Sequence, residues 1–190
     1  AAIHYEIYTE SDNRHDAIIY SQGIASFKAA VKLPGLDIVG LQSQMNQGEL
    51  SAAQCYPLFK AMGLNYGIGH QGISTLYRGE NQLLAKLELP ESVRSNESDY
   101  VLHPSLMDSA LQASIGLVLD AATLERGSIP ALSLPFALES IDIIRPCTIG
   151  MYAWVRHEKG NAETAKVQKL DIDLCDMQGN ICVQMKGFTS

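Results

Sequence analysis

The sequence predicts an α+β domain in which an antiparallel sheet wraps around one buried helix. Three observations support this fold class: a single long helical pattern is apolar around most of its circumference, short strand-like segments lie on both sides of it, and nothing repeats at a solenoid period. Of the 190 residues, 46 % are hydrophobic and 18 % are charged, which is typical of a globular domain with enough apolar material for a core.

Two strand-like segments open the chain. Apolar residues occupy every second position in residues 3–8, and residues 17–25 read as the second strand of an antiparallel hairpin. Because a lone hairpin is marginally stable in water, we expect both strands to belong to a larger sheet. Residues 32–48 are mixed and polar, with a Pro-Gly pair, and predict a loop-like linker.

The middle of the chain predicts a short helix and two strands. Ser51 has the position of a helix N-cap, but Pro57 lies inside the following pattern, so we expect the helix to begin near Tyr56 or to bend there. Two strands then follow, at residues 72–78 and 82–89.

The longest helical pattern runs from Pro104 to Leu119. Its apolar residues recur at spacings of four, three and four, a second apolar row widens the face, and proline suits the first helical position. We therefore expect this helix to be the buried one. Four more strands are predicted after it, around residues 137–144, 150–157, 165–175 and 180–188, with a tight turn at Gly179 joining the last two.

Charge and cysteine content narrow the function classes. The net charge is 14 − 21 = −7, which argues against a surface that binds nucleic-acid phosphates or anionic lipid. The sequence has no membrane-spanning apolar run and no signal peptide at its start. The cysteines are scattered without a C-x-x-C pair, so we expect free buried thiols in a cytoplasmic protein rather than a zinc site or disulfides: Cys55, Cys147, Cys175 and Cys182.

The buried helix carries a candidate pair of polar side chains. Asp108 and Gln112 are four residues apart, so they project from the same helix face. A buried carboxylate is costly unless it is paired or protonated, and the Gln112 amide could hold Asp108 in one rotamer while leaving its outer oxygen available. The alternative is that Asp108 only complements the helix dipole. His103 lies roughly 140° around the helix from Asp108, so we expect it at the helix entrance.

Two further segments attract attention. Residues 63–72 hold four glycines, which would let the backbone approach a neighbour or a ligand closely, although their spacing matches no phosphate-binding loop. His70 within this segment is a titratable candidate, and a partly buried packing role is the alternative. Leu134, Pro135 and Phe136 read only as an edge strand or a strand entrance.

Together, these segments resemble the dehydratase domain of modular polyketide synthases, and in particular the C-terminal half of its double hot-dog fold. The family's G-Y-x-Y-G-P-x-F-Q motif is similar to residues 63–71, and its H-P-x-x-x-D-x-x-x-Q/H motif is intact from His103 to Gln112. Its L-P-F segment and its D-x-x-G hairpin match residues 134–136 and 176–179. Ser21-Gln22-Gly23 resembles bacterial synthases served by a separate acyltransferase, the trans-acyltransferase type.

Two departures from the family pattern are informative. Ile68 and His70 replace Pro and Phe of the central motif, which alters the expected shape of the acyl tunnel. The H-x-x-x-G-x-x-x-x-P motif that carries the family's catalytic histidine is absent. We therefore expect a fragment, with trailing strands of the first hot dog in 1–30, a linker in 31–50 and the C-terminal hot dog in 51–190.

The resemblance implies elimination of water from a β-hydroxyacyl thioester, which an acyl carrier protein presents on phosphopantetheine. Asp108 would be the general acid, Gln112 would orient it, and the histidine base would come from the missing half. The substrate-binding residues implied are Tyr66, Gly67 and His70 near the β-hydroxyl, and Leu134, Pro135 and Phe136 in the tunnel wall. No metal or further cofactor is implied. The implied partners are the carrier protein and neighbouring synthase domains, with homodimerisation open.

Other functions stay open. An enoyl isomerase or pyran-forming relative would share the fold, but isomerases of this family commonly carry Asn where Asp108 stands. A catalytically degenerate half could serve carrier-protein docking or dimerisation, and a hot-dog acyl-thioester hydrolase would lack these motifs. We expect the 190-residue chain alone to be inactive.

Overall fold

The computed structural model describes residues 2–9, 17–29, 33–118, 134–158 and 168–190. These residues fall into two units, Ala1–Lys32 and Leu33–Ser190, each of which is described by itself.

The first unit is an antiparallel hairpin. β1 (Ala2–Tyr8) pairs with β2 (Ile19–Ser26) in a two-stranded sheet, which confirms the predicted pair of strands. The larger sheet that we expected around them is not seen, because no other described strand pairs with either one. As a result the hairpin's large apolar side chains are exposed, among them Ile3, Tyr5, Ile7, Tyr20 and Ile24.

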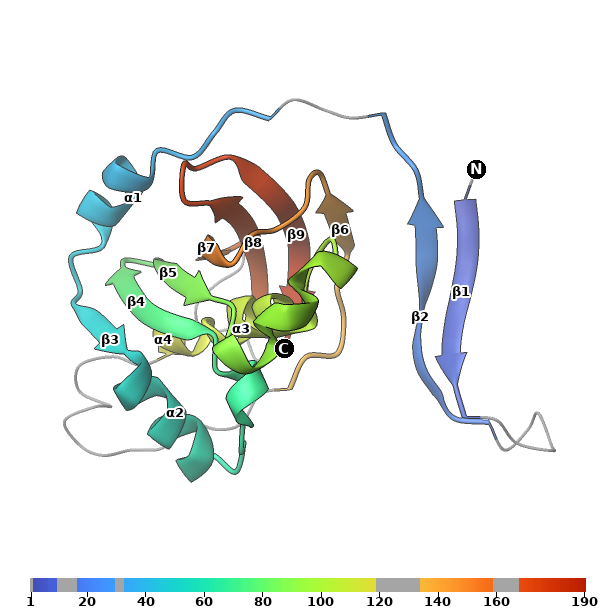
Figure 1. Ribbon diagram of the computed structural model, residues 1–190, viewed down its shortest axis with the longest axis horizontal. Coiled ribbons are helices and arrows are strands. Elements are labelled where there is room, and N and C mark those ends of the chain that lie inside the picture. Colours follow the sequence, from blue (N-terminus) through green and yellow to red (C-terminus); the bar gives the residue numbers. More distant parts are fainter. Residues whose placement is uncertain (1, 10–16, 30–32, 119–133, 159–167) are drawn as a thin grey trace. The chain divides into compact units, whose positions relative to one another are not determined.

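The second unit is built on a seven-stranded sheet in the order β3-β4-β5-β7-β8-β9-β6, with every neighbouring pair antiparallel (Figure 1). The strands are β3 (Glu49–Ser51), β4 (Ile73–Gly79), β5 (Gln82–Glu88), β6 (Ser140–Ile143), β7 (Gly150–His157), β8 (Lys169–Asp176) and β9 (Ile181–Thr189). The strands predicted from β4 onward are therefore all present. Gly179 closes the β8–β9 turn with a positive φ of 84°, as expected of a tight turn.

The central helix is shorter than the sequence predicts. α3 (Pro104–Gln112) begins at the expected proline, but the chain leaves the helix at Ala113 and resumes as α4 (Ile115–Val118). The backbone N–H of Ser114 and its hydroxyl both bond the carbonyl of Leu111, at 3.1 and 2.7 Å, which tightens the turn and ends α3. Leu119, the predicted helix end, lies outside the described residues.

The core lies between α3 and the sheet. Leu106, Ala110 and Ala113 are buried on the helix side. Inward-facing strand residues complete the cluster, including Leu76, Leu83, Ala85, Met151, Ala153, Val155, Ile172, Leu174, Val183 and Met185. All four cysteines are free and buried, as predicted.

One close approach fixes α3 against the start of β4. A Cβ added to Gly72, a buried residue, would lie 2.5 Å from the Ser109 hydroxyl and 3.0 Å from the Glu88 carbonyl oxygen. Only glycine fits there without a shift. The glycine-rich segment therefore approaches α3 closely at Gly72, as its glycine content predicted.

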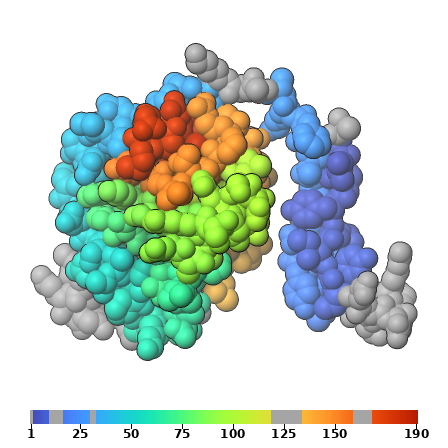
Figure 2. Space-filling model, viewed as in Figure 1, coloured from blue at the N-terminus to red at the C-terminus, as the bar shows by residue number. Residues whose placement is uncertain are grey.

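Three segments differ from the sequence-based expectation. The expected linker, residues 31–50, contains α1 (Ile38–Gln44), capped by Asp37, and most of β3. α2 (Ala52–Ala61) begins directly after the predicted cap Ser51 and accommodates Pro57 within the helix. The polar residues 91–99, for which the sequence predicts a loop, form the 3-10 segment η3 (Glu91–Asp99), which is kinked at Asn96 and lies on the surface, yellow-green in Figure 2.

Candidate functional site

His103 caps the helix that carries the candidate acid. Its Nδ1 accepts a hydrogen bond from the backbone N–H of Ser105 at 3.1 Å, so Nε2 carries the proton and donates to Asn96 Oδ1 at 3.2 Å. Desolvation lowers the pKa of His103; the electrostatic effect of nearby His70 acts in the same direction, and the charge of Glu97 opposes both. His103 is therefore neutral and structural, and the expected place at the helix entrance is confirmed.

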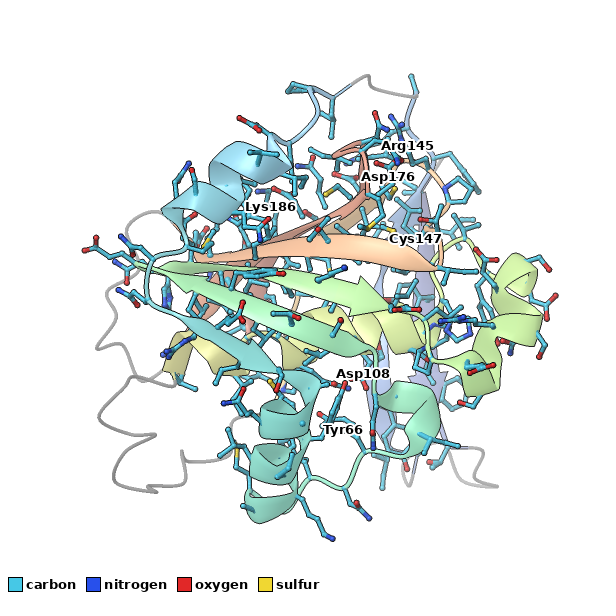
Figure 3. The ribbon with its side chains drawn as sticks, turned by 60° about the vertical axis from the view of Figure 1, so that its left-hand side comes forward. Tyr66, Asp108, Arg145, Cys147, Asp176 and Lys186 are labelled. Atoms are coloured by element: carbon cyan, nitrogen blue, oxygen red, sulfur yellow. The ribbon has the colours of Figure 1, made fainter. Side chains whose placement is uncertain are left out.

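Asp108, Gln112 and His70 meet one turn further along α3 (Figure 3, where Asp108 is labelled). The Gln112 side-chain N–H₂ donates to Asp108 Oδ2 at 2.8 Å and to the backbone carbonyl of His70 at 2.9 Å. His70 Nδ1 lies 3.1 Å from the same Oδ2. His70 belongs to η2 (Ile68–His70), so the site joins α3 to the glycine-rich segment.

Tyr56 on α2 fixes the orientation of the Gln112 amide. The Tyr56 hydroxyl accepts from the backbone N–H of Ile73 at 2.9 Å and donates to Gln112 Oε1 in a longer bond of 3.4 Å. Desolvation raises the pKa of Tyr56, which keeps the phenol protonated and able to donate. With Oε1 accepting, the amide nitrogen of Gln112 has to face Asp108 and His70.

The carboxyl is less enclosed than we expected. The Asp108 side chain is 35 % exposed and that of His70 is 49 % exposed, whereas the Gln112 residue is 4 % exposed. Asp108 lies on the part of α3 that faces the η2 turn and not the apolar sheet, and its partners are polar. Within the described ranges both contacts go to Oδ2, so Oδ1 has no hydrogen-bond partner there.

Tyr66 and Gly67 lie beside this group. The Tyr66 ring packs edge-on against the Phe59 ring, with centroids 5.1 Å apart. The Gln71 side-chain amide donates a hydrogen bond to the backbone carbonyl of Tyr66 at 2.8 Å. Desolvation raises the pKa of Tyr66, and the charge of Asp108 adds to this (both are labelled in Figure 3). Gly67 is exposed, and a Cβ placed on it would meet no atom within 4 Å.

The third group of predicted residues is attached to another part of the sheet. Leu134 and Phe136 are 60 % and 69 % exposed, and Pro135 is exposed as well. The backbone N–H of Phe136 bonds the carbonyl of Thr189 at the end of β9, at 3.1 Å. The hydrogen bond of Phe136 therefore attaches this segment to β9.

Two features of the site were not predicted from the sequence. Tyr56 was expected only as part of a helix, and no local pattern marks its bond to Gln112, 56 residues away. His70 was expected to bind substrate, but its contact with Asp108 was not expected. The replacement of Phe by His in the central motif was the one available signal.

The described part of the chain shows no cluster of three or more His, Cys, Asp or Glu side chains that could hold a metal ion. Nor does it contain a helix of the length and apolarity that a membrane crossing requires.

Comparisons with known proteins agree on the family. A family model for the polyketide synthase dehydratase N-terminal domain matches residues 37–190. The polyketide synthase PksN of Bacillus subtilis is 48 % identical over 188 residues, which is 99 % of this chain and 3 % of PksN. A crystal structure of a trans-AT polyketide synthase dehydratase domain from Brevibacillus brevis is 47 % identical, with a TM-score of 0.89, over 99 % of this chain and 64 % of that one.

A more distant structure, an inactive histidine-to-phenylalanine mutant of the CurK dehydratase, is 26 % identical with a TM-score of 0.82, over 100 % of this chain and 63 % of that one. The chain thus spans less than two thirds of these solved chains. The fold is the predicted hot-dog fold. The chain belongs to the polyketide synthase dehydratase family.

Proposed function

We propose that this chain is part of a dehydratase domain that removes water from a β-hydroxyacyl thioester held on an acyl carrier protein. The observation that carries the proposal is the Asp108 carboxyl, held at Oδ2 by the Gln112 amide with Oδ1 left without a partner in the described structure. A carboxyl held in this way can present one oxygen to a substrate in a fixed direction.

The chemistry needs an acid and a base. The base removes the proton from the α-carbon, a double bond forms between the α- and β-carbons, and the bond to the β-hydroxyl breaks. Because hydroxide is a poor leaving group, Asp108 donates its proton from Oδ1 as the bond breaks, and water leaves. Asp108 is the acid and Gln112 its positioning residue.

The base is proposed to be a histidine from outside this chain. The family's H-x-x-x-G-x-x-x-x-P motif is absent here, while the CurK dehydratase with a histidine changed to phenylalanine is an inactive mutant. The chain would then hold the C-terminal hot dog in 51–190, and 1–30 would supply trailing strands of the first hot dog. The exposed apolar side chains of β1 and β2 support this, since such strands are stable only within a larger sheet.

Tyr66, Gly67 and His70 are proposed to bind the substrate around its β-hydroxyl, because they lie on the segment that meets Asp108. Leu134, Pro135 and Phe136 are proposed as part of the acyl tunnel wall, a role that suits their exposed apolar surface. Phosphopantetheine would carry the substrate in place of a bound cofactor. The proposed partners are the carrier protein and neighbouring synthase domains, in the cytoplasm.

The test uses the complete dehydratase domain that contains this chain, incubated with a 3-hydroxyacyl carrier protein. Mass spectrometry should detect an acyl chain lighter by one water. Asp108→Asn should abolish this loss without unfolding the protein, whereas Asp99→Asn, a matched change in exposed η3, should not. Retained turnover in Asp108→Asn would overturn the acid assignment. If the domain released no water from the 3-hydroxyacyl substrate but moved the double bond of a separately supplied 2-enoyl carrier protein, the isomerase alternative would be favoured.

A further inference from the structure

We infer that His70 is a second positioning residue for Asp108, one that works with Gln112 to place the acidic proton on Oδ1. The inference rests on the proposed function, because it concerns how the acid of that reaction is presented. His70 Nδ1 and the Gln112 amide nitrogen approach the same carboxyl oxygen, Oδ2, at 3.1 and 2.8 Å.

The direction of the Gln112 bond is settled by its surroundings. Gln112 Oε1 faces the Tyr56 hydroxyl, and its nitrogen also donates to the backbone carbonyl of His70 at 2.9 Å. Gln112 is therefore a donor to Oδ2. An ionised carboxylate oxygen can only accept hydrogen bonds, so when Asp108 is ionised the 3.1 Å contact requires His70 to carry its proton on Nδ1.

Two donors on Oδ2 have a consequence for the acid. A carboxyl oxygen that accepts two N–H bonds is a poor place for a proton, so the proton of the acid form resides on Oδ1. Oδ1 is the oxygen without a partner in the described residues, and thus the one that a substrate hydroxyl can reach. The titratable groups around the pair are Tyr56, Tyr66 and His103, two phenols and a neutral imidazole.

A packing role does not explain His70. Its side chain is 49 % exposed, and phenylalanine, which the resembling motif carries at this position, could not donate to Asp108. The backbone of the turn is held separately, by the bond from Gln112 to the His70 carbonyl. Changing the side chain therefore leaves the attachment of η2 to α3 in place, and the variants should fold.

The experiment compares His70→Phe with His70→Asn in the complete domain. Asparagine places its N–H₂ near the position of Nδ1, so it retains the donor that phenylalanine removes. Losing a hydrogen bond to a carboxyl should lower kcat by about 10- to 100-fold in His70→Phe, a larger effect than the accompanying change in KM. His70→Asn should stay within a few-fold of wild type, and the control His157→Phe, at the end of β7, should be unaffected.

Two kinetic outcomes would overturn the inference: His70→Phe with wild-type kcat, or His70→Asn losing as much activity as His70→Phe. A wild-type domain that releases no water would instead contradict the proposed function. Nitrogen-15 NMR of histidine-labelled domain gives a readout independent of turnover. It should show His70 protonated at Nδ1 in the wild type and shifted toward Nε2 in Asp108→Ala, whereas an Nε2–H tautomer in the wild type would overturn the inference.

Discussion

The contact between Gly72 and α3 leads to a prediction about how the site is held. We expect Gly72→Ala to destabilise the domain, because the new methyl group would lie 2.5 Å from the Ser109 hydroxyl and 3.3 Å from its Cβ. The methyl group cannot move toward β5 instead, because the Glu88 carbonyl oxygen would be 3.0 Å away. The backbone of Gly72 is also held there, since the Glu88 N–H donates to the Gly72 carbonyl at 2.8 Å.

The magnitude follows from two opposing terms. Overpacking of a buried site costs about 1–3 kcal/mol. Replacing glycine also reduces the conformational entropy of the unfolded chain, which offsets about 0.4–1 kcal/mol of this. The free energy of unfolding should therefore fall by about 0.6–2 kcal/mol, which corresponds to a melting temperature lower by roughly 1–8 °C in a domain of this size.

Urea unfolding followed by circular dichroism measures this change. The matched control is Gly67→Ala in the same glycine-rich segment, where a Cβ meets nothing within 4 Å, and its midpoint should stay close to wild type. Ser109→Ala, which removes the nearest atom, should partly rescue Gly72→Ala in the double variant. If Gly72→Ala and Gly67→Ala unfolded at the same midpoint, the close approach of β4 and α3 would be refuted.

Three further predictions concern polar groups away from the acid. Arg156→Met should lower the free energy of unfolding in urea by about 3 kcal/mol or more, because it leaves the buried Asp173 carboxylate without the guanidinium 2.7 Å away; an unchanged midpoint would contradict this. Desolvation acts to raise the pKa of Asp176, but hydrogen bonds from Asn180 outweigh it and the pKa lies below its usual range. The Asp176 carboxylate stabilises the fold above the unfolded-state pKa of about 3.9, and this stabilisation is lost as pH falls through the folded-state pKa. Asp176→Ala should therefore lower the free energy of unfolding less at acidic pH than at pH 6, as measured by urea unfolding at each pH. Desolvation lowers the pKa of His103, so stability should fall as pH drops below about 6.5, the unfolded-state value; His103→Asn, which keeps a cap acceptor, should flatten that slope.

Much of the fold could be predicted because its signals are local. The pattern of residues 82–89 predicted β5 to within one residue, and the turn at Gly179 correctly marked the connection between β8 and β9, although β8 begins at Lys169 and not near residue 165. Pro104 correctly marked the first residue of α3. Two elements were not predicted correctly. The linker expected before residue 51 contains α1, a helix capped by Asp37. The α3 helix ends earlier than predicted because the Ser114 hydroxyl bonds the Leu111 carbonyl.

Only part of the candidate site could be predicted from the sequence. The spacing of Asp108 and Gln112 predicted that they share a helix face, and the structure places a hydrogen bond between them. The partner that reaches the same carboxyl, His70, lies 38 residues earlier, and nothing local indicates which element its turn will meet. Contacts of this kind depend on the packing of β4 against α3, which pattern alone does not reveal.

The central claim is that Asp108 donates a proton to the departing hydroxyl oxygen. Changing the leaving group of the substrate tests this claim most directly. The complete domain and its Asp108→Asn variant should be assayed with a 3-hydroxyacyl and a 3-chloroacyl carrier protein, after subtraction of spontaneous elimination. Chloride needs no proton to leave, so we expect a loss of about 100-fold or more with the hydroxyl substrate and little loss with the chloro substrate. An equal loss with both substrates, or none with either, would contradict this role for Asp108.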